Sequence, residues 1–215
     1  MMCGIHLDRQ DPFAEVDLWV NYRMQETPQN LVIRVFGRHD ITLHIDDGCM
    51  GGGDTDGDGY TGDDGRGGSI PHDPEMTDDE WVFNANSYTD QYFTDSSPER
   101  VGIFRHCMIV HTGEASREGG TLGGTSFFYI DDERLDDPHW RDMAQTFMHE
   151  LGHTLTLPEI GHKGAEYRSV MNYDWEDDDF SWPIDYYTGW YHDPDNNNQW
   201  TYVDEWGSLD FSARL

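Results

Sequence analysis

The feature that most constrains this chain is the stretch at residues 137–155, which has the marks of a single amphipathic helix. Asp137 can accept a hydrogen bond from the first turn as an N-cap residue, and Pro138 fits the first helical position. Two of its histidines, His149 and His153, fall outside the apolar stripe. That stripe recurs at steps of three and four residues and is predicted to be buried: Trp140, Met143, Ala144, Phe147, Met148, Leu151 and Leu155.

The two histidines are four residues apart, so their imidazoles project from one face of the predicted helix. Two ring nitrogens at this spacing can bind one metal ion. Glu150, one step round the helix, would lie beside that ion, where its carboxylate can take a proton from a water molecule. The segment 149–153 therefore predicts a zinc site bound by His149 and His153, with Glu150 as general base. A helix with two solvated histidines is the plainer alternative.

A second segment, Ser169-Val170-Met171-Asn172-Tyr173, follows this helix. Together the two segments resemble the metzincin metalloproteases, in which an H-E-x-x-H helix is followed by a Met-turn whose methionine underlies the zinc. The resemblance implies that Met171 is the Met-turn methionine. Tyr173 matches the tyrosine that approaches the metal in astacin- and serralysin-like members, and it would hydrogen-bond the oxyanion during catalysis. The implied activity is that of a zinc-dependent endopeptidase.

For the fold, the resemblance implies an α/β (α+β) architecture. We expect a twisted mixed sheet, two main helices, the active-site helix and a small irregular C-terminal subdomain. The upper subdomain would comprise residues 1–161 and the lower one residues 162–215, with the Met-turn, in one catalytic domain. The aromatic residues between Trp175 and Trp206 are expected to pack inside the lower subdomain, with a carbohydrate platform as the alternative.

The chain departs from the metzincin pattern H-E-x-x-H-x-x-G-x-x-H, which would place glycine at 156 and histidine at 159. It has Thr156 and Glu159 instead. Because a β-branched residue poorly tolerates a positive φ, the turn after the helix is expected to differ in detail. Residues 156–159 resemble the Gly-Leu-Pro-Asp of the snapalysin branch, whose third ligand is a carboxylate. The altered turn favours His162 as third zinc ligand, with Glu159 as the alternative. A degenerate site in a pseudo-peptidase is a further possibility.

An acidic, glycine-rich loop spans residues 48–68. Within it, residues 54–60 match the first half of an EF-hand loop. Gly65 stands where that pattern needs a bidentate glutamate, and Asp63 or Asp64 could complete the shell instead. We expect a structural calcium site here, with a solvated acidic turn as the alternative. Its ligands would be Asp54, Asp56, Asp58, Tyr60 and Asp63.

The net charge is −30, from 43 acidic and 13 basic residues, and Lys163 is the only lysine. Such an excess of carboxylates argues against nucleic acid or an anionic membrane as a partner. It resembles the composition of proteins from salt-accumulating halophiles, in which molar salt screens the repulsion between carboxylates. We therefore expect a monomer that acts on a peptide or protein, with Zn²⁺ and Ca²⁺ as cofactors. A calcium-stabilised binding module that keeps the fold without turnover is the alternative function.

No stretch approaches the 18 apolar residues of a membrane span, and no signal peptide is visible at the start. Secretion is favoured for a protease, and the cytoplasm of a salt-accumulating halophile is the alternative. Along the chain, the patterns predict strands at 14–20, 41–46, 100–111 and 127–130 and helices at 28–35 and 77–93. The strand–helix–strand opening implies a parallel pair. The glycine-rich stretch 114–124 is expected to be flexible, where metzincins carry the edge strand of the substrate cleft.

Overall fold

The computed structural model describes residues 13–19, 24, 26–46, 69–70, 88–94, 101–110, 119–121, 126–131, 140–175 and 184–212. The loop predicted to bind calcium, with Asp54, Asp56, Asp58, Tyr60 and Asp63, lies outside these residues. So do Asp137 and Pro138 at the start of the histidine helix. None of the helices in the described part of the chain is long and apolar enough to span a membrane.

The main sheet is mixed and has the strand order β2-β1-β4-β6-β5, with β3 also paired to β1. All its pairings are parallel except that of β5 with β6. The parallel pairing of β1 with β2 across α1 was predicted from the sequence and is confirmed. The strands are β1 (Phe13–Trp19), β2 (His44–Asp46), β3 (Ser69–Ile70), β4 (Phe104–Val110), β5 (Gly119–Thr121) and β6 (Phe127–Asp131).

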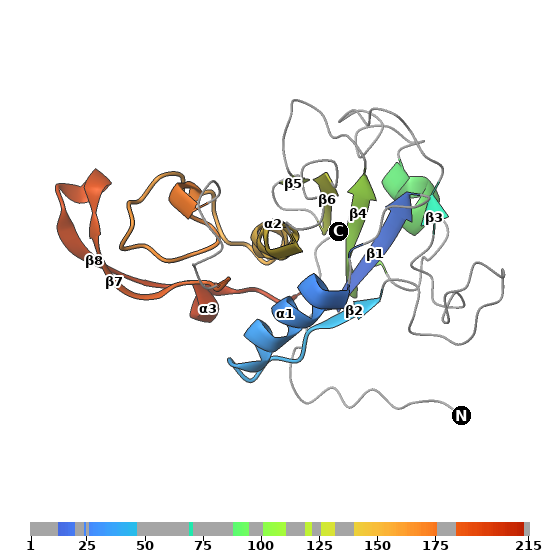
Figure 1. Ribbon diagram of the computed structural model, residues 1–215, viewed down its shortest axis with the longest axis horizontal. Coiled ribbons are helices and arrows are strands. Elements are labelled where there is room, and N and C mark those ends of the chain that lie inside the picture. The colour runs from blue at the N-terminus through green and yellow to red at the C-terminus, as the bar shows by residue number, and fades with distance from the viewer. Residues whose placement is uncertain are drawn as a thin grey trace.

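Two helices, α1 (Glu26–Gly37) and α2 (Trp140–Thr154), share one hydrophobic core with the sheet. Alternate residues of β4 and β6 enter that core, so both helices cover the same sheet face (Figure 1). The other face carries His106, on which Phe93 of the π-helical segment η2 (Asp90–Thr94) stacks at 4.7 Å. The core side chains from these elements include Val32, Val35, Phe36, Cys107, Ile109, Phe128, Ile130, Phe147 and Leu151.

Two expectations about local structure change. The stretch expected to be flexible contains β5, a short antiparallel strand at the end of the sheet order. Of the helix predicted at 77–93, the structure describes only the end, which runs from Tyr88 into the π-helical segment. Helix α1 exceeds its predicted range at both ends, and at its C-terminal end the apolar face continues to Phe36 against the core. The mixed α/β architecture itself matches the expectation.

The C-terminal region has more regular structure than the resemblance implied. Strands β7 (Thr188–Asp193) and β8 (Gln199–Asp204) form an antiparallel hairpin, followed by the short helix α3 (Glu205–Ser208). The single-turn 3-10 helices η4 (Tyr173–Trp175) and η5 (Pro194–Asn196) precede and join these strands. The aromatic side chains divide between the hairpin's two faces, so the expected core packing holds for only some of them. Tyr191 is buried, whereas Trp190, Trp200 and Tyr202 are exposed.

The chain that follows α2 approaches this helix closely at Gly152. A Cβ placed there would lie 2.8 Å from the Sδ atom of Met171 and 3.0 Å from the ring of Tyr186. Neither neighbour can withdraw easily, because Met171 is fully buried and the Tyr186 hydroxyl donates to the Met148 carbonyl at 2.6 Å. Glycine is therefore required at 152 for packing, although it is a poor helix former.

Gly152→Ala is expected to lower the free energy of unfolding by about 1–3 kcal/mol, the usual cost of overfilling a packed core. Gly37→Ala is the matched control, because Gly37 also lies in a helix and a Cβ there would meet nothing within 4 Å. Urea denaturation of the two variants measures the difference. Equal stabilities would contradict the close packing of Met171 and Tyr186 against α2.

Candidate metal centre

Three side chains that can bind a metal converge at the C-terminal end of α2. His149 and His153 lie on this helix, and Glu159 reaches them from the segment after it. One ligand atom from each lies within 4.8 Å of the others, and no other group of three such residues occurs within the described ranges. His149 is buried, His153 is partly exposed and Glu159 is exposed, so the group opens to solvent on one side.

Backbone carbonyls orient both imidazoles. The Nδ1 atom of His149 lies 2.7 Å from the Val170 carbonyl oxygen, and that of His153 lies 3.0 Å from the Leu157 carbonyl oxygen. A carbonyl can only accept, so each Nδ1 carries a proton, and in the neutral form of each ring Nε2 presents a lone pair. The two Nε2 atoms face each other at 3.1 Å. Carbonyl partners of this kind commonly hold metal-binding histidines in the correct tautomer.

Burial also keeps His149 neutral. Desolvation, followed by the nearby His153, lowers the pKa of the His149 imidazole to about 4, although its bond to the Val170 carbonyl acts in the opposite direction. A neutral imidazole is the form that binds a metal. At neutral pH the ring therefore needs no deprotonation to act as a ligand.

The donor set fits zinc. Two nitrogens bound to one tetrahedral zinc ion at the usual bond length are about 3.3 Å apart, close to the spacing of the two Nε2 atoms. The Oε2 atom of Glu159 lies 3.3 Å from the Nε2 atom of His153. Two imidazoles and one carboxylate are a known zinc donor set that leaves a fourth position for water.

The turn that ends α2 differs from the sequence-based expectation. Thr156 adopts a left-handed conformation with φ of +79°, despite its branched Cβ. The amide of Thr156 donates to the His153 carbonyl at 3.0 Å, and the amide of Leu157 donates to the Gly152 carbonyl at 2.9 Å. These two bonds form a complete Schellman motif, which requires a left-handed residue at this position. The expectation that threonine alters the turn was wrong, because the hydrogen bonds of the turn outweigh the strain at Thr156.

His162, the first choice for the third ligand, lies elsewhere. Its Nδ1 atom is 2.8 Å from Oδ1 of Asp174, and its side chain is 73% exposed. Its ring also contacts the edge of the Tyr173 ring at 5.8 Å. The preference for His162 rested on an altered turn that the structure does not contain. The geometry favours the alternative ligand, Glu159, and zinc binding by either residue stays a prediction.

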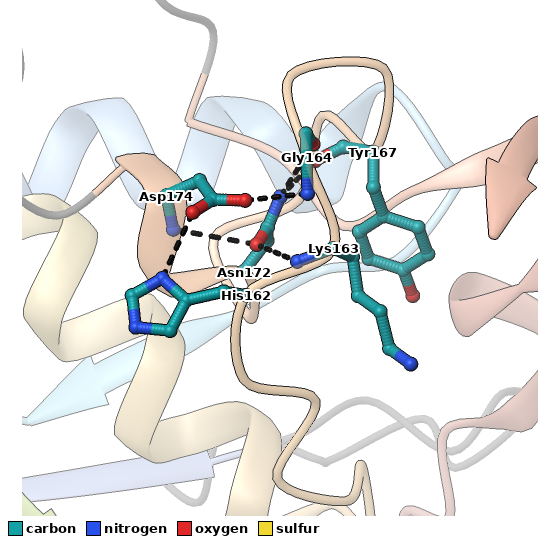
Figure 2. A network of polar contacts seen from close by, with 6 residues as sticks. All are labelled: His162, Lys163, Gly164, Tyr167, Asn172 and Asp174. Carbon is teal, nitrogen blue, oxygen red and sulfur yellow. Dashed lines mark hydrogen bonds and ion pairs between the residues drawn. The ribbon is translucent and has the colours of Figure 1, made fainter. Parts of the chain in front are cut away.

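Asn172 fixes the loop that carries His162 (Figure 2). The Asn172 side chain accepts from the Lys163 amide at 3.0 Å and donates to the carbonyls of Gly164 and Tyr167 at 3.0 and 2.8 Å. Asp174 accepts from the Gly164 amide on the same loop. Asn172 is fully buried, so its amide can satisfy these backbone groups without competition from water. The loop at residues 162–167 is thus held against the segment at 169–173.

The buried carboxylate of Glu205, in α3, holds that segment from the other side. It accepts from the hydroxyls of Tyr167 and Ser169 and from the Tyr187 amide, each at 2.5 Å. Ser169 in turn accepts from the Met171 amide at 3.0 Å. Burial raises the pKa of Glu205, and the bonds from Ser169 and Tyr167 oppose this shift. Met171 is therefore anchored at its backbone, although its role as a Met-turn residue stays a prediction.

The two residues predicted to act in catalysis both lie next to the predicted metal ligands. Glu150 follows His149 in α2 and is 6% exposed, and its Oε2 atom accepts from the Thr121 hydroxyl at 2.5 Å. The Tyr173 ring stacks on the His149 ring, with centroids 5.6 Å apart and planes at 22°. Glu150 is therefore positioned beside the histidine pair, and Tyr173 covers one face of His149.

Sequence reasoning missed the partners that orient these side chains. The sequence gives no sign that the carbonyls of Val170 and Leu157 orient the histidines, because every residue has a backbone carbonyl. Glu205 gave none either, since it is one acidic residue among many in this chain. Thr121 lies in a stretch interpreted as flexible because of its glycines, and only the pairing of β5 with β6 brings it to Glu150.

No protein-family model matches this chain, and no curated protein matches it. Among solved structures, the chain is similar to the crystal structure of archaemetzincin from Methanopyrus kandleri. The TM-score is 0.45 and the sequence identity 12%, over 78% of this chain and 84% of that chain. A likeness at this level is too weak to carry an argument, so the function must be inferred from the geometry of the centre itself.

Thr156→Gly is expected to raise the free energy of unfolding by about 1 kcal/mol, because glycine adopts a positive φ without strain. The isosteric Thr156→Val keeps the branched Cβ and should give no such gain. Thermal and urea denaturation of the metal-free proteins compares the two. A glycine variant no more stable than the valine variant would contradict a strained threonine in the Schellman turn.

Proposed function

We propose that this protein is a zinc-dependent endopeptidase whose zinc ligands are His149, His153 and Glu159. The observation that carries the proposal is the convergence of the Nε2 atoms of His149 and His153, 3.1 Å apart, with a carboxylate oxygen 3.3 Å from one of them. Two facing lone pairs repel each other unless a cation lies between them. The buried Glu150 beside this group adds the base that hydrolysis requires.

Each residue has a defined task in this proposal. Zinc, when bound, supplies the Lewis acidity that polarises a peptide carbonyl and acidifies water. Glu150 accepts a proton from the attacking water and delivers it to the leaving amine. Tyr173 donates a hydrogen bond to the oxyanion that develops on the substrate. The Val170 and Leu157 carbonyls hold His149 and His153 in the tautomer that leaves Nε2 free.

The substrate is a peptide or protein. The exposed side of the centre, where Glu159 is 57% exposed, leaves room for a chain that enters from solvent. With a net charge of −30, the protein repels nucleic acids and favours neutral or basic peptides. In this proposal the enzyme is a monomer, and its activity does not require calcium at the acidic loop of residues 48–68.

Turnover of a quenched peptide library tests the activity, measured with added zinc at low and at molar salt. The wild-type protein should cleave internal peptide bonds, and Glu150→Gln should abolish nearly all of the activity because it removes the base. Tyr173→Phe should keep zinc and lower kcat by about 10²–10³, the usual loss for one oxyanion donor. A wild-type protein that binds zinc without any turnover would point to the binding-module alternative.

Zinc titration of two alanine variants tests the third ligand. Glu159→Ala should weaken zinc binding by more than the roughly 10–100-fold typical of losing a residue that only hydrogen-bonds a ligand, since a direct ligand is removed. His162→Ala should bind zinc like the wild-type protein, because its ring is paired with Asp174 away from the group. Competition for zinc with a chromophoric chelator measures the zinc affinity of each variant. The reverse order of affinities would restore His162 as the ligand.

A further inference from the structure

Glu150 has one close side-chain partner whose role the proposed reaction does not explain. The hydroxyl of Thr121 lies 2.5 Å from Oε2 of Glu150 and 3.2 Å from its backbone carbonyl oxygen. A buried carboxylate is costly unless donors satisfy it. The hydroxyl has one proton to donate, and the shorter distance assigns that proton to Oε2. Thr121 therefore supplies a donor to one oxygen of the proposed base.

The sheet edge is built so that this hydroxyl can reach α2. Thr121 pairs with Phe128 in the antiparallel β5–β6 ladder, and two glycines precede it. A Cβ on Gly119 would lie 2.9 Å from Cγ2 of Thr146 and 3.1 Å from Cγ of Glu150. Only a glycine lets the strand lie this close to the helix face that carries Glu150. Gly119 thus serves close packing of the strand on α2.

We propose that Thr121 is a positioning residue for Glu150. Its hydroxyl holds one carboxylate oxygen, and this contact fixes the rotamer of the side chain that takes the proton from water. A β-branched side chain suits this task, since its χ1 angle is restricted. This inference rests on the proposed function for its catalytic consequence. The contact between Thr121 and the Glu150 carboxylate can be tested without any activity.

Kinetics of two Thr121 variants test the catalytic consequence. Thr121→Val keeps the shape and removes the donor, and should lower kcat by about 10–100-fold, as expected for one hydrogen bond to a charged group. KM should change less than about twofold, because the lost contact orients the base and does not bind substrate. Thr121→Ser keeps the hydroxyl and should restore most of kcat. Zinc affinity should be the same in all three proteins, since other groups orient His149 and His153.

Thr188→Val is the matched control. Thr188 also donates its hydroxyl to a carboxylate, that of Asp204 at 2.9 Å, but in the C-terminal hairpin. Loss of this hydrogen bond in Thr188→Val should leave kcat and KM unchanged. An undiminished kcat in Thr121→Val would overturn the inference. So would an equal loss in the valine and serine variants, because the hydroxyl that serine keeps would then contribute nothing to kcat.

A double-mutant cycle on unfolding supplies the readout that is independent of activity. Melting temperatures are compared for the wild-type protein, Thr121→Val, Glu150→Ala and the double variant, all without metal. Groups in contact give non-additive changes, so the double variant should melt higher than the sum of the single changes requires. Additive changes would overturn the inference even in an active enzyme. Non-additive changes in a protein without turnover would support the contact and refute the proposed function.

Discussion

The hydrogen bond between the Nδ1 atom of His149 and the Val170 carbonyl, at 2.7 Å, joins the two parts of this molecule on which the centre depends. It can form only because the chain returns beneath α2. That return requires the absence of a side chain at Gly152, where Met171 packs against the helix. The bond sets the tautomer of His149 and so leaves the Nε2 atom of this buried histidine able to bind a metal. Other parts of the C-terminal region hold Val170 in place.

The supports of this bond are buried polar groups that are satisfied by hydrogen bonds. Glu205 accepts from Tyr167, Ser169 and the Tyr187 amide, and Asn172 spans the neighbouring loop. Such networks stabilise a single arrangement of the backbone, because leaving any one of their members unpaired would be costly. The centre can therefore be open to solvent on one side and still have ligands of fixed orientation.

Local strain and precise orientation coexist at the end of α2. Thr156 stays at a positive φ, and the turn it permits brings the Leu157 carbonyl back to His153 at 3.0 Å. It also lets the following residues carry Glu159 to within 3.3 Å of the same ring. Strain of this kind persists where the surrounding contacts outweigh it. Threonine at this position is therefore compatible with the close approach of Glu159 to His153.

Much of the fold followed from patterns along the chain. Periodicity along the chain predicts contacts between near neighbours directly. Such contacts determine the apolar stripe of α2, the strand–helix–strand opening and the spacing of His149, Glu150 and His153. The third ligand could not be derived in this way. Thr156 predicted a changed turn, and the hydrogen bonds of the folded chain show that this prediction was wrong. The C-terminal hairpin could not be predicted from the sequence, because its aromatic residues face both the core and solvent.

The sequence by itself determined which helix offers two imidazoles and a carboxylate, since a four-residue step places side chains on one face in any α-helix. Tertiary structure alone decided which carboxylate joins them, which carbonyls orient them and that Thr121 reaches Glu150. Those contacts join residues that are separated along the chain by a turn, a loop or a strand crossing. Their formation depends on the balance of strain, packing and buried hydrogen bonds over the whole fold, which no local pattern contains.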